Sequence, residues 1–133
     1  MNEKTEVLIK YRLDKAKETL ESAEILLNGN KMFSSVNRIY YAMFYSVSAL
    51  LLKKKLVSSK HSGVLAYFNR EFVHKGIVSE KFGRFYSEMF RYRQKGDYED
   101  FAEFNKEEVK DWLNKAKEFV SEIGKLLEER GNH

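Results

Sequence analysis

Apolar residues recur every three or four positions along most of this chain, which is the spacing of helices that bury one face. A first helix is predicted from about residue 3 to residue 28, where Gly29 permits the turn that ends it. Its apolar positions are Leu13, Ala16, Leu20, Ala23 and Leu27. Lysine and glutamate fill the remaining face, so this helix is predicted to lie at the surface of a core.

Cap and turn residues divide the rest of the chain into further helices. The predicted helix caps are Ser58-Ser59, Ser79 and Asn105, and the predicted helix ends are Gly76 and Gly96. No segment shows the alternation of a half-buried strand. The pattern therefore predicts an all-α fold, an antiparallel bundle of four long helices plus a fifth, in a single domain spanning residues 1–133.

The second helix, predicted over residues 34–55, organises this bundle. Between Arg38 and Lys53 lie fourteen residues without a charge, Ile39 to Leu52. A membrane span needs about 20 apolar residues, so this run predicts a buried core helix and no membrane segment. Both sides of the helix are apolar, which requires several neighbouring helices. Arg38 lies with Tyr41 on the less apolar side of this helix, and a charge at the start of such an apolar run needs an explanation.

Composition narrows the class of protein. The chain has 133 residues with 43% hydrophobic content and contains neither cysteine nor proline. Lacking cysteine and an apolar N-terminal run, it is expected to be cytoplasmic. Residues 38–95 hold twelve basic and three acidic side chains. This basic middle fits an anionic partner such as RNA, and it equally fits a solvated face that pairs with the acidic C-terminal helix.

Arg93 is the sharpest candidate for chemistry. At 100° per residue it falls within the apolar stripe of the fourth helix, whereas Arg84 and Arg91 fall on the opposite face. A buried guanidinium should meet a carboxylate, a bound anion or a groove open to water. If Gly96 ends the helix, Asp97 and Tyr98 turn back towards Arg93, as ligand-binding groups or as an internal ion pair.

Two other cations are candidate anion contacts. Lys60 and His61 fall in the first turn of the third helix, where backbone N–H groups attract phosphate. Arg38 lies near the start of the second helix, where a cation opposes the helix dipole and so favours a bound anion. The alternative for each is an ordinary solvated side chain or an internal salt bridge.

Several chemistries lack the residues that they need. The chain has no Walker loop, no GxGxxG, no GxSxG and no HExxH motif. Glu71 and His74 have the spacing of half a di-iron site, but the second half is missing. No metal and no cofactor are therefore expected.

Three motifs, taken in order, resemble the HEPN family, in particular a branch of small stand-alone prokaryotic proteins. They are Arg38-x-Tyr40-Tyr41-Ala42-Met43-Phe44-Tyr45, Lys60-His61-Ser62-Gly63 and Arg93-Gln94-x-x-Asp97-Tyr98. The resemblance covers nearly the whole chain. It implies a helical bundle that forms a homodimer, binds RNA or nucleotides and acts beside a minimal nucleotidyltransferase in a toxin–antitoxin pair. Many members are metal-independent endoribonucleases.

The resemblance also implies roles for individual residues. The family's ribonucleases carry an arginine followed four to six residues later by a histidine; the arginine falls on Arg93, but Asp97 and Tyr98 stand where the histidine would be. A carboxyl group of ordinary acidity is a weak proton acceptor at neutral pH. The candidate catalytic residues are Arg93 and Asp97. The candidate RNA- or nucleotide-binding residues are Arg38, Tyr41, Lys60, His61, Arg93 and Tyr98.

Three functions remain open at this point. The favoured one is a dimeric module that binds RNA or a nucleotide phosphate through Arg38, Lys60 and Arg93. The second is a ribonuclease that uses Arg93 with Asp97, Tyr98 or His61. The third is a structural module whose polar cluster holds the bundle and the dimer together.

Overall fold

The computed structural model describes residues 2–98 and 103–128, and every regular element in this part of the chain is helical. The elements are α1 (Glu3–Asn28), α2 (Met32–Leu52), α3 (His61–Phe68), the π-helical turn η1 (Asn69–Val73), α4 (Glu80–Tyr98) and α5 (Lys106–Glu128). Four helices are long and α3 is short. The expected all-α bundle is confirmed.

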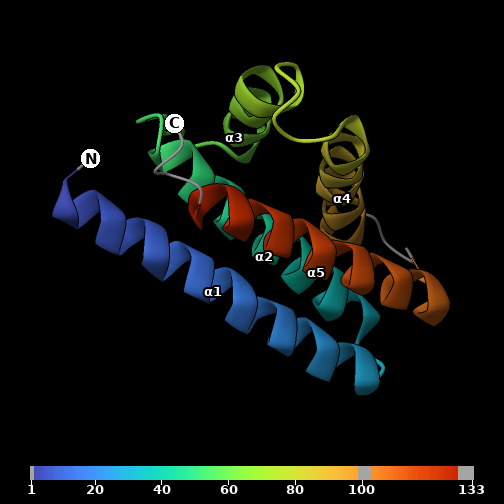
Figure 1. Cartoon of the computed structure of the whole chain (residues 1–133). Coiled ribbons are helices and arrows are strands. Elements are labelled where there is room, and N and C mark those ends of the chain that lie inside the picture. Colours follow the sequence, from blue (N-terminus) through green and yellow to red (C-terminus); the bar gives the residue numbers. More distant parts are fainter. Residues whose placement is uncertain (1, 99–102, 129–133) are drawn as a thin grey trace.

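Helix α2 lies at the centre of the molecule, as its uncharged sequence predicted. It packs against α1, α3, α4 and α5. Figure 1 shows α1 and α2 running in opposite directions side by side, with α5 along them and with α3 and α4 on the side of α2 away from α1. Ser35 of α2 donates a buried hydrogen bond of 2.8 Å to the carbonyl oxygen of Ala23 in α1, which fixes this pair.

One strip of α2 is left partly uncovered. Most of the helix from Ser35 to Leu52 is buried, but six residues at helical spacing are only half-buried: Asn37, Arg38, Tyr41, Phe44, Tyr45 and Ser48. The sequence pattern predicted Phe44 on the more apolar side of the helix and Arg38 on the opposite side. In the fold both border the same exposed strip, because α3 covers α2 only in part.

The predicted helix caps are right at two of three places. Ser79 Oγ accepts a hydrogen bond from the N–H of Phe82, and Asn105 caps α5 through the N–H groups of Glu107 and Glu108. The cap predicted at Ser58-Ser59 is wrong. Helix α3 begins at His61, with Lys60 as the cap residue and no side-chain cap.

The segment before α3 explains that difference. Ser58 Oγ accepts a hydrogen bond of 3.2 Å from the N–H of Lys60, so the serine closes the turn that precedes the helix. Gly63 permits this turn, because a Cβ at this position would lie 2.1 Å from Ser58 Oγ. The close approach fixes the point where α3 starts and therefore the position of His61.

The predicted third helix is also interrupted. It changes from α to π geometry at Asn69 and ends at Val73, before the predicted stop at Gly76. Gly76 instead takes a positive φ of 77° in the turn that follows. Helix α4 packs closely on the π turn, because Gly83 lies where a Cβ would approach the Val73 methyl groups to 3.0 Å.

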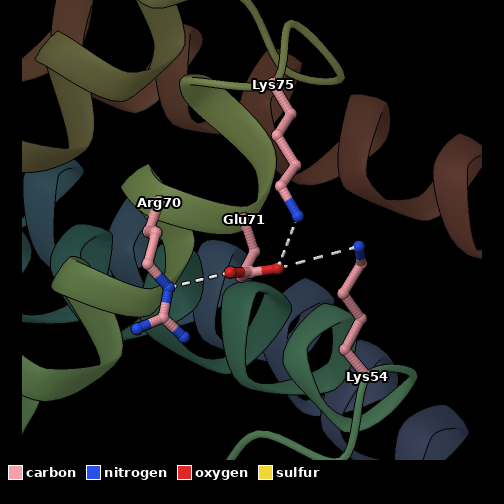
Figure 2. A network of polar contacts seen from close by, with 4 residues as sticks. All are labelled: Lys54, Arg70, Glu71 and Lys75. Atoms are coloured by element: carbon pink, nitrogen blue, oxygen red, sulfur yellow. Dashed lines mark hydrogen bonds and ion pairs between the residues drawn. The ribbon is translucent and has the colours of Figure 1, made fainter.

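Figure 2 shows how polar contacts tie η1 to the segment after α2. The Glu71 carboxylate accepts hydrogen bonds from Arg70 Nε at 2.8 Å and Lys75 Nζ at 2.9 Å, and Lys54 Nζ lies 3.9 Å away. These hydrogen bonds, that of Lys75 first, lower the pKa of Glu71 from 4.5 to about 2. Three cations thus share one acid.

Helix α4 does not end at Gly96, which corrects the sequence prediction. It continues to Tyr98, so Asp97 remains one helical turn beyond Arg93. Glycine suits this site for packing: a Cβ on Gly96 would lie 3.1 Å from the Phe104 ring and 3.3 Å from the Phe33 ring. The turn-back geometry expected for Asp97 is replaced by helical i, i+4 spacing.

Candidate anion-binding site on α2, α3 and α4

Arg93 projects from α4 into the seam between α2 and the start of α3. Its side chain is only 16% exposed. Arg93 Nε lies 3.2 Å from Asp97 Oδ2, and Arg93 NH1 lies 3.2 Å from His61 Nδ1. The partly buried guanidinium therefore has a carboxylate on one side and an imidazole on the other, and its NH2 group makes no protein hydrogen bond in the described chain.

The contact with Arg93 defines the protonation of His61. A guanidinium only donates hydrogen bonds, so Nδ1 of the imidazole accepts and Nε2 carries the hydrogen in the neutral ring. Burial, and secondly the charge of Arg93, lowers the pKa of His61 below its usual 6.5. The neutral ring thus predominates at neutral pH. Both side chains then offer N–H donors, which is the arrangement that an anion requires.

Aromatic rings form the floor under these two groups. The His61 ring centroid lies 4.4 Å from that of Phe44 and 5.6 Å from that of Tyr40. The Arg93 guanidinium carbon lies 5.4 Å from the Tyr40 ring centre and 5.5 Å from the Tyr41 ring centre. Burial raises the pKa of Tyr40 to about 12, so this fully buried phenol stays neutral.

Arg38 joins the same site through Tyr41. Its guanidinium carbon lies 5.0 Å from the Tyr41 ring centre, so the two arginines contact one ring. Arg38 Nε and NH2 donate to Asn37 Oδ1 at 3.1 and 2.8 Å, and within the described chain no carboxylate pairs with this half-buried cation. Counted over the residues that the structure describes, the site therefore carries more positive than negative charge.

The structure brings most of the sequence candidates together. Tyr41, His61, Arg93 and Asp97 form a connected cluster, and Arg38 reaches it over Tyr41. Lys60 is exposed at the cap position of α3, next to His61. Tyr98 ends α4, but its side chain lies outside the described part of the structure.

Sequence reasoning missed three residues of this cluster: Asn37, Tyr40 and Phe44. Asn37 orients Arg38, and the other two rings support His61 and Arg93. Helical spacing from Arg38 through Tyr41 to Phe44 was the available signal. This spacing does not by itself assign the residues to a site, because aromatic residues at these positions also fit an ordinary core.

Comparisons with known proteins agree with this fold. A family model described as the HEPN domain matches residues 9–126. A "UPF0332 protein" of Thermotoga maritima is 54% identical over 129 residues, which cover 97% of each chain. Two proteins of Methanocaldococcus jannaschii, named "Putative toxin MJ0142" and "Putative toxin MJ0605", are also similar. They are 39% and 36% identical over 86% and 91% of this chain, and over 78% and 90% of their own lengths.

Proposed function

Because the chain belongs to the HEPN domain family, we propose that it binds the phosphate groups of RNA or of a nucleotide at the Arg93 site. The observation that carries the proposal is the contact of 3.2 Å between Arg93 NH1 and His61 Nδ1. It leaves the imidazole Nε2–H and the guanidinium NH2 as donors in a seam where Asp97 is the one acid that contacts Arg93 among the described residues. Charge-assisted hydrogen bonds to phosphate are strong in such a place.

Arg38 and Lys60 extend the proposed phosphate contacts along the site. Within residues 2–98 and 103–128, Arg38 donates hydrogen bonds only to the neutral oxygen of Asn37, so its charge would be available to an anion. Lys60 is exposed beside the uncapped first turn of α3. Tyr41 holds both guanidinium groups by ring contacts and would orient them, and Tyr98 remains a proposed member of the binding set.

Substitution of Arg93 tests the proposal. Binding of fluorescein-labelled tRNA, measured by fluorescence anisotropy, should weaken about tenfold or more in Arg93→Ala, since a hydrogen bond to a charged group contributes about 1.5–3 kcal/mol. Arg91→Ala is the matched control: this arginine is exposed on the other face of α4 and has no ion pair with a described residue.

Thermal unfolding separates binding from structure. Arg93→Ala should keep a melting temperature close to that of the wild type, because its ion pair with Asp97 is partly exposed. A wild type that binds neither tRNA nor ATP, together with an Arg93→Ala variant that loses several kcal/mol of stability, would establish the purely structural function instead.

RNA cleavage is a second candidate function, and the position of His61 favours it specifically. Its imidazole lies beside Arg93, whereas the family's motif histidine is missing after Arg93 in the sequence. The lowered pKa keeps this ring neutral, so Nδ1 can accept a proton once its contact with Arg93 opens. The RNA 2′-hydroxyl would attack the adjacent phosphorus and the P–O5′ bond would break, which gives a 2′,3′-cyclic phosphate and a 5′-hydroxyl. His61 or Asp97 would take the 2′-hydroxyl proton, water would protonate the leaving 5′-oxygen, and Arg93 would stabilise the phosphate charge.

Incubation of the pure protein with tRNA in EDTA tests cleavage. If the second candidate holds, the wild type cuts the RNA, and both Arg93→Ala and His61→Ala abolish the cut. Asp97→Ala reports whether the carboxylate takes part. His74→Ala, which changes an exposed histidine, should cleave as the wild type does. Intact RNA would contradict cleavage and leave the binding proposal unaffected.

We further propose that the protein acts as a homodimer in the cytoplasm, in a toxin–antitoxin-like system with a minimal nucleotidyltransferase. The names of the two Methanocaldococcus jannaschii relatives, each described as a putative toxin, support the proposed role as the toxin of such a system. Among residues 2–98 and 103–128, none of the helices is both long and apolar enough to cross a bilayer. Induced expression of the wild-type protein should slow the growth of a bacterial host, and expression of Arg93→Ala should slow growth less.

A further inference from the structure

A groove of about 200 Å³ adjoins the Arg93 site. It lies between α1, the half-buried strip of α2 and the segment that leads into α3. The lining residues used below are Arg12 of α1, Phe44, Tyr45 and Ser48 of α2, and Leu56 and Ser58 of the following segment. None of these six belongs to the binding set that the sequence predicted.

Contacts on two of its walls connect this groove with the Arg93 site. The Phe44 ring, which lines the groove, contacts the His61 imidazole, and His61 in turn contacts Arg93. On the other wall, Ser58 accepts the hydrogen bond from the N–H of Lys60. A ligand whose phosphate reached Arg93 and Lys60 would therefore have its neighbouring group at the mouth of the groove.

The cations around the groove lack acidic partners. Arg12 is half-buried and forms no ion pair with any described residue, and Lys15 lies 4.9 Å above the Tyr45 ring without a carboxylate partner. Lys10 on the same helix does pair with an acid, Asp14, at 2.7 Å. A partly buried cation without an acid is costly unless an anion or water meets it. The groove thus combines aromatic walls with unneutralised positive charge.

We propose that this groove is a nucleobase subsite, an inference that rests on phosphate binding at Arg93. The base next to the bound phosphate packs against Phe44 and Tyr45, and the following phosphate meets Arg12 and Lys15. The Ser48 hydroxyl, which makes no hydrogen bond in the described chain, is free to meet the edge of the base. A paired base would first have to be unstacked and unpaired, which opposes binding, so the ligand that this subsite favours is single-stranded RNA.

A second copy of the chain is the competing occupant, and the charge pattern disfavours it. The groove would then receive an apolar side chain, and the copy would also have to bring carboxylates to both Arg12 and Lys15. A nucleotide brings a flat ring and a phosphate together, which matches both features at once.

Anisotropy titrations with three labelled probes test the subsite: a single-stranded eight-nucleotide uridine RNA, the same backbone without bases, and a duplex of equal length. The wild type should bind the single strand more tightly than the other two. Stacking of one base contributes about 1–3 kcal/mol, so Tyr45→Ala should weaken binding of the uridine RNA about fivefold or more and leave the abasic probe nearly unchanged. Arg12→Gln should weaken both single-stranded probes.

Control variants keep this test specific. Tyr67→Ala removes a half-buried tyrosine that contacts Arg70 instead of the groove, and Arg84→Gln removes an arginine that is paired with Glu80. Both should bind the uridine RNA as the wild type does. Tyr45→Leu keeps an apolar side chain without a ring, so it should reproduce the loss seen in Tyr45→Ala while the fold, checked by circular dichroism, is preserved.

The outcomes separate the subsite from phosphate binding. Unchanged affinity of both Tyr45 variants for uridine RNA, with the loss in Arg93→Ala retained, would overturn the subsite and leave the proposed function standing. Absence of binding to every probe by the wild type would overturn both. If Tyr45→Ala lowers the mass measured by light scattering and the wild type binds abasic and uridine probes equally, the groove belongs to a second copy.

Discussion

Arg93 and His61 are 32 residues apart in the sequence and meet because α3 begins beside α4. Helical spacing alone indicated that Arg93 would be partly buried and need a polar partner. It could not show that His61 is this partner, because that contact depends on the Ser58 turn and on Gly63 beneath it. The sequence therefore predicted the residues of the site better than their contacts.

The protonation of His61 provides a test at the scale of one residue. Its NMR titration should give a pKa below 6.5, because burial and, secondly, the Arg93 charge disfavour the imidazolium. In Arg93→Ala the pKa should rise towards 6.5 without reaching it, since burial is the larger cause. Added inorganic phosphate should raise the pKa in the wild type, because a bound anion favours the charged ring.

The same shift has a consequence for stability. The folded pKa of His61 is lower than the unfolded value of 6.5, so the unfolded chain binds more protons as the pH falls. The contribution of His61 is present above 6.5 and is lost as the pH falls through the folded pKa. A folded-state pKa of His61 at or above 6.5 would contradict the described burial and the contact with Arg93.

At the scale of helices and turns, local signals predicted α1 and the caps of α4 and α5, because capping uses residues that are neighbours in sequence. The π turn η1 and the passage of α4 through Gly96 were not predictable in this way. Both depend on packing between different elements: Gly83 of α4 against Val73 of η1, and Gly96 of α4 against Phe33 of α2. Tertiary packing overrode the local preference of glycine to end a helix.

The Glu71 network should make the attachment of η1 sensitive to acid (Figure 2). The folded pKa of about 2 lies below the usual 4.5, so the carboxylate contributes stability above pH 4.5 that is lost as the pH falls through 2. Chemical denaturation should show Glu71→Gln to be less stable than the wild type at neutral pH. This difference in stability should shrink steadily as the pH falls from 4.5 towards about 2.

A matched variant distinguishes the network from a general charge effect. Glu80→Gln removes the same charge from an exposed residue whose only described ion pair, with Arg84, is 3.7 Å long. It should change stability less than Glu71→Gln at neutral pH. Equal effects of the two substitutions at every pH would show that Arg70 and Lys75 do not hold Glu71 in solution.

At the scale of the whole molecule, the absence of charge between Ile39 and Leu52 was sufficient to predict the central position of α2. The uneven distribution of charge along the chain was less informative. It left open whether the basic residues pair with α5 or meet an external anion. In the described residues, the ion pairs of the basic middle of the chain are made with acids outside α5: Lys54, Arg70 and Lys75 with Glu71, Arg84 with Glu80, and Arg93 with Asp97. Arg38 has no acid among the described residues.

The salt dependence of RNA binding tests the proposed site and the proposed dimer together. For a single strand, each phosphate contact contributes about −0.7 to the slope of log K against log salt. Arg93→Gln or Arg38→Gln should therefore make the slope shallower by about 0.7 if one chain meets the RNA, and by about 1.4 if one RNA spans equivalent contacts on two copies. Arg91→Gln should leave the slope unchanged.

Sedimentation equilibrium supplies the mass of the assembly independently, since one chain is 15.7 kDa. A dimeric mass with the smaller change in slope would mean that the two copies bind RNA separately, and an unchanged slope in both variants would remove the phosphate contacts on which the function depends.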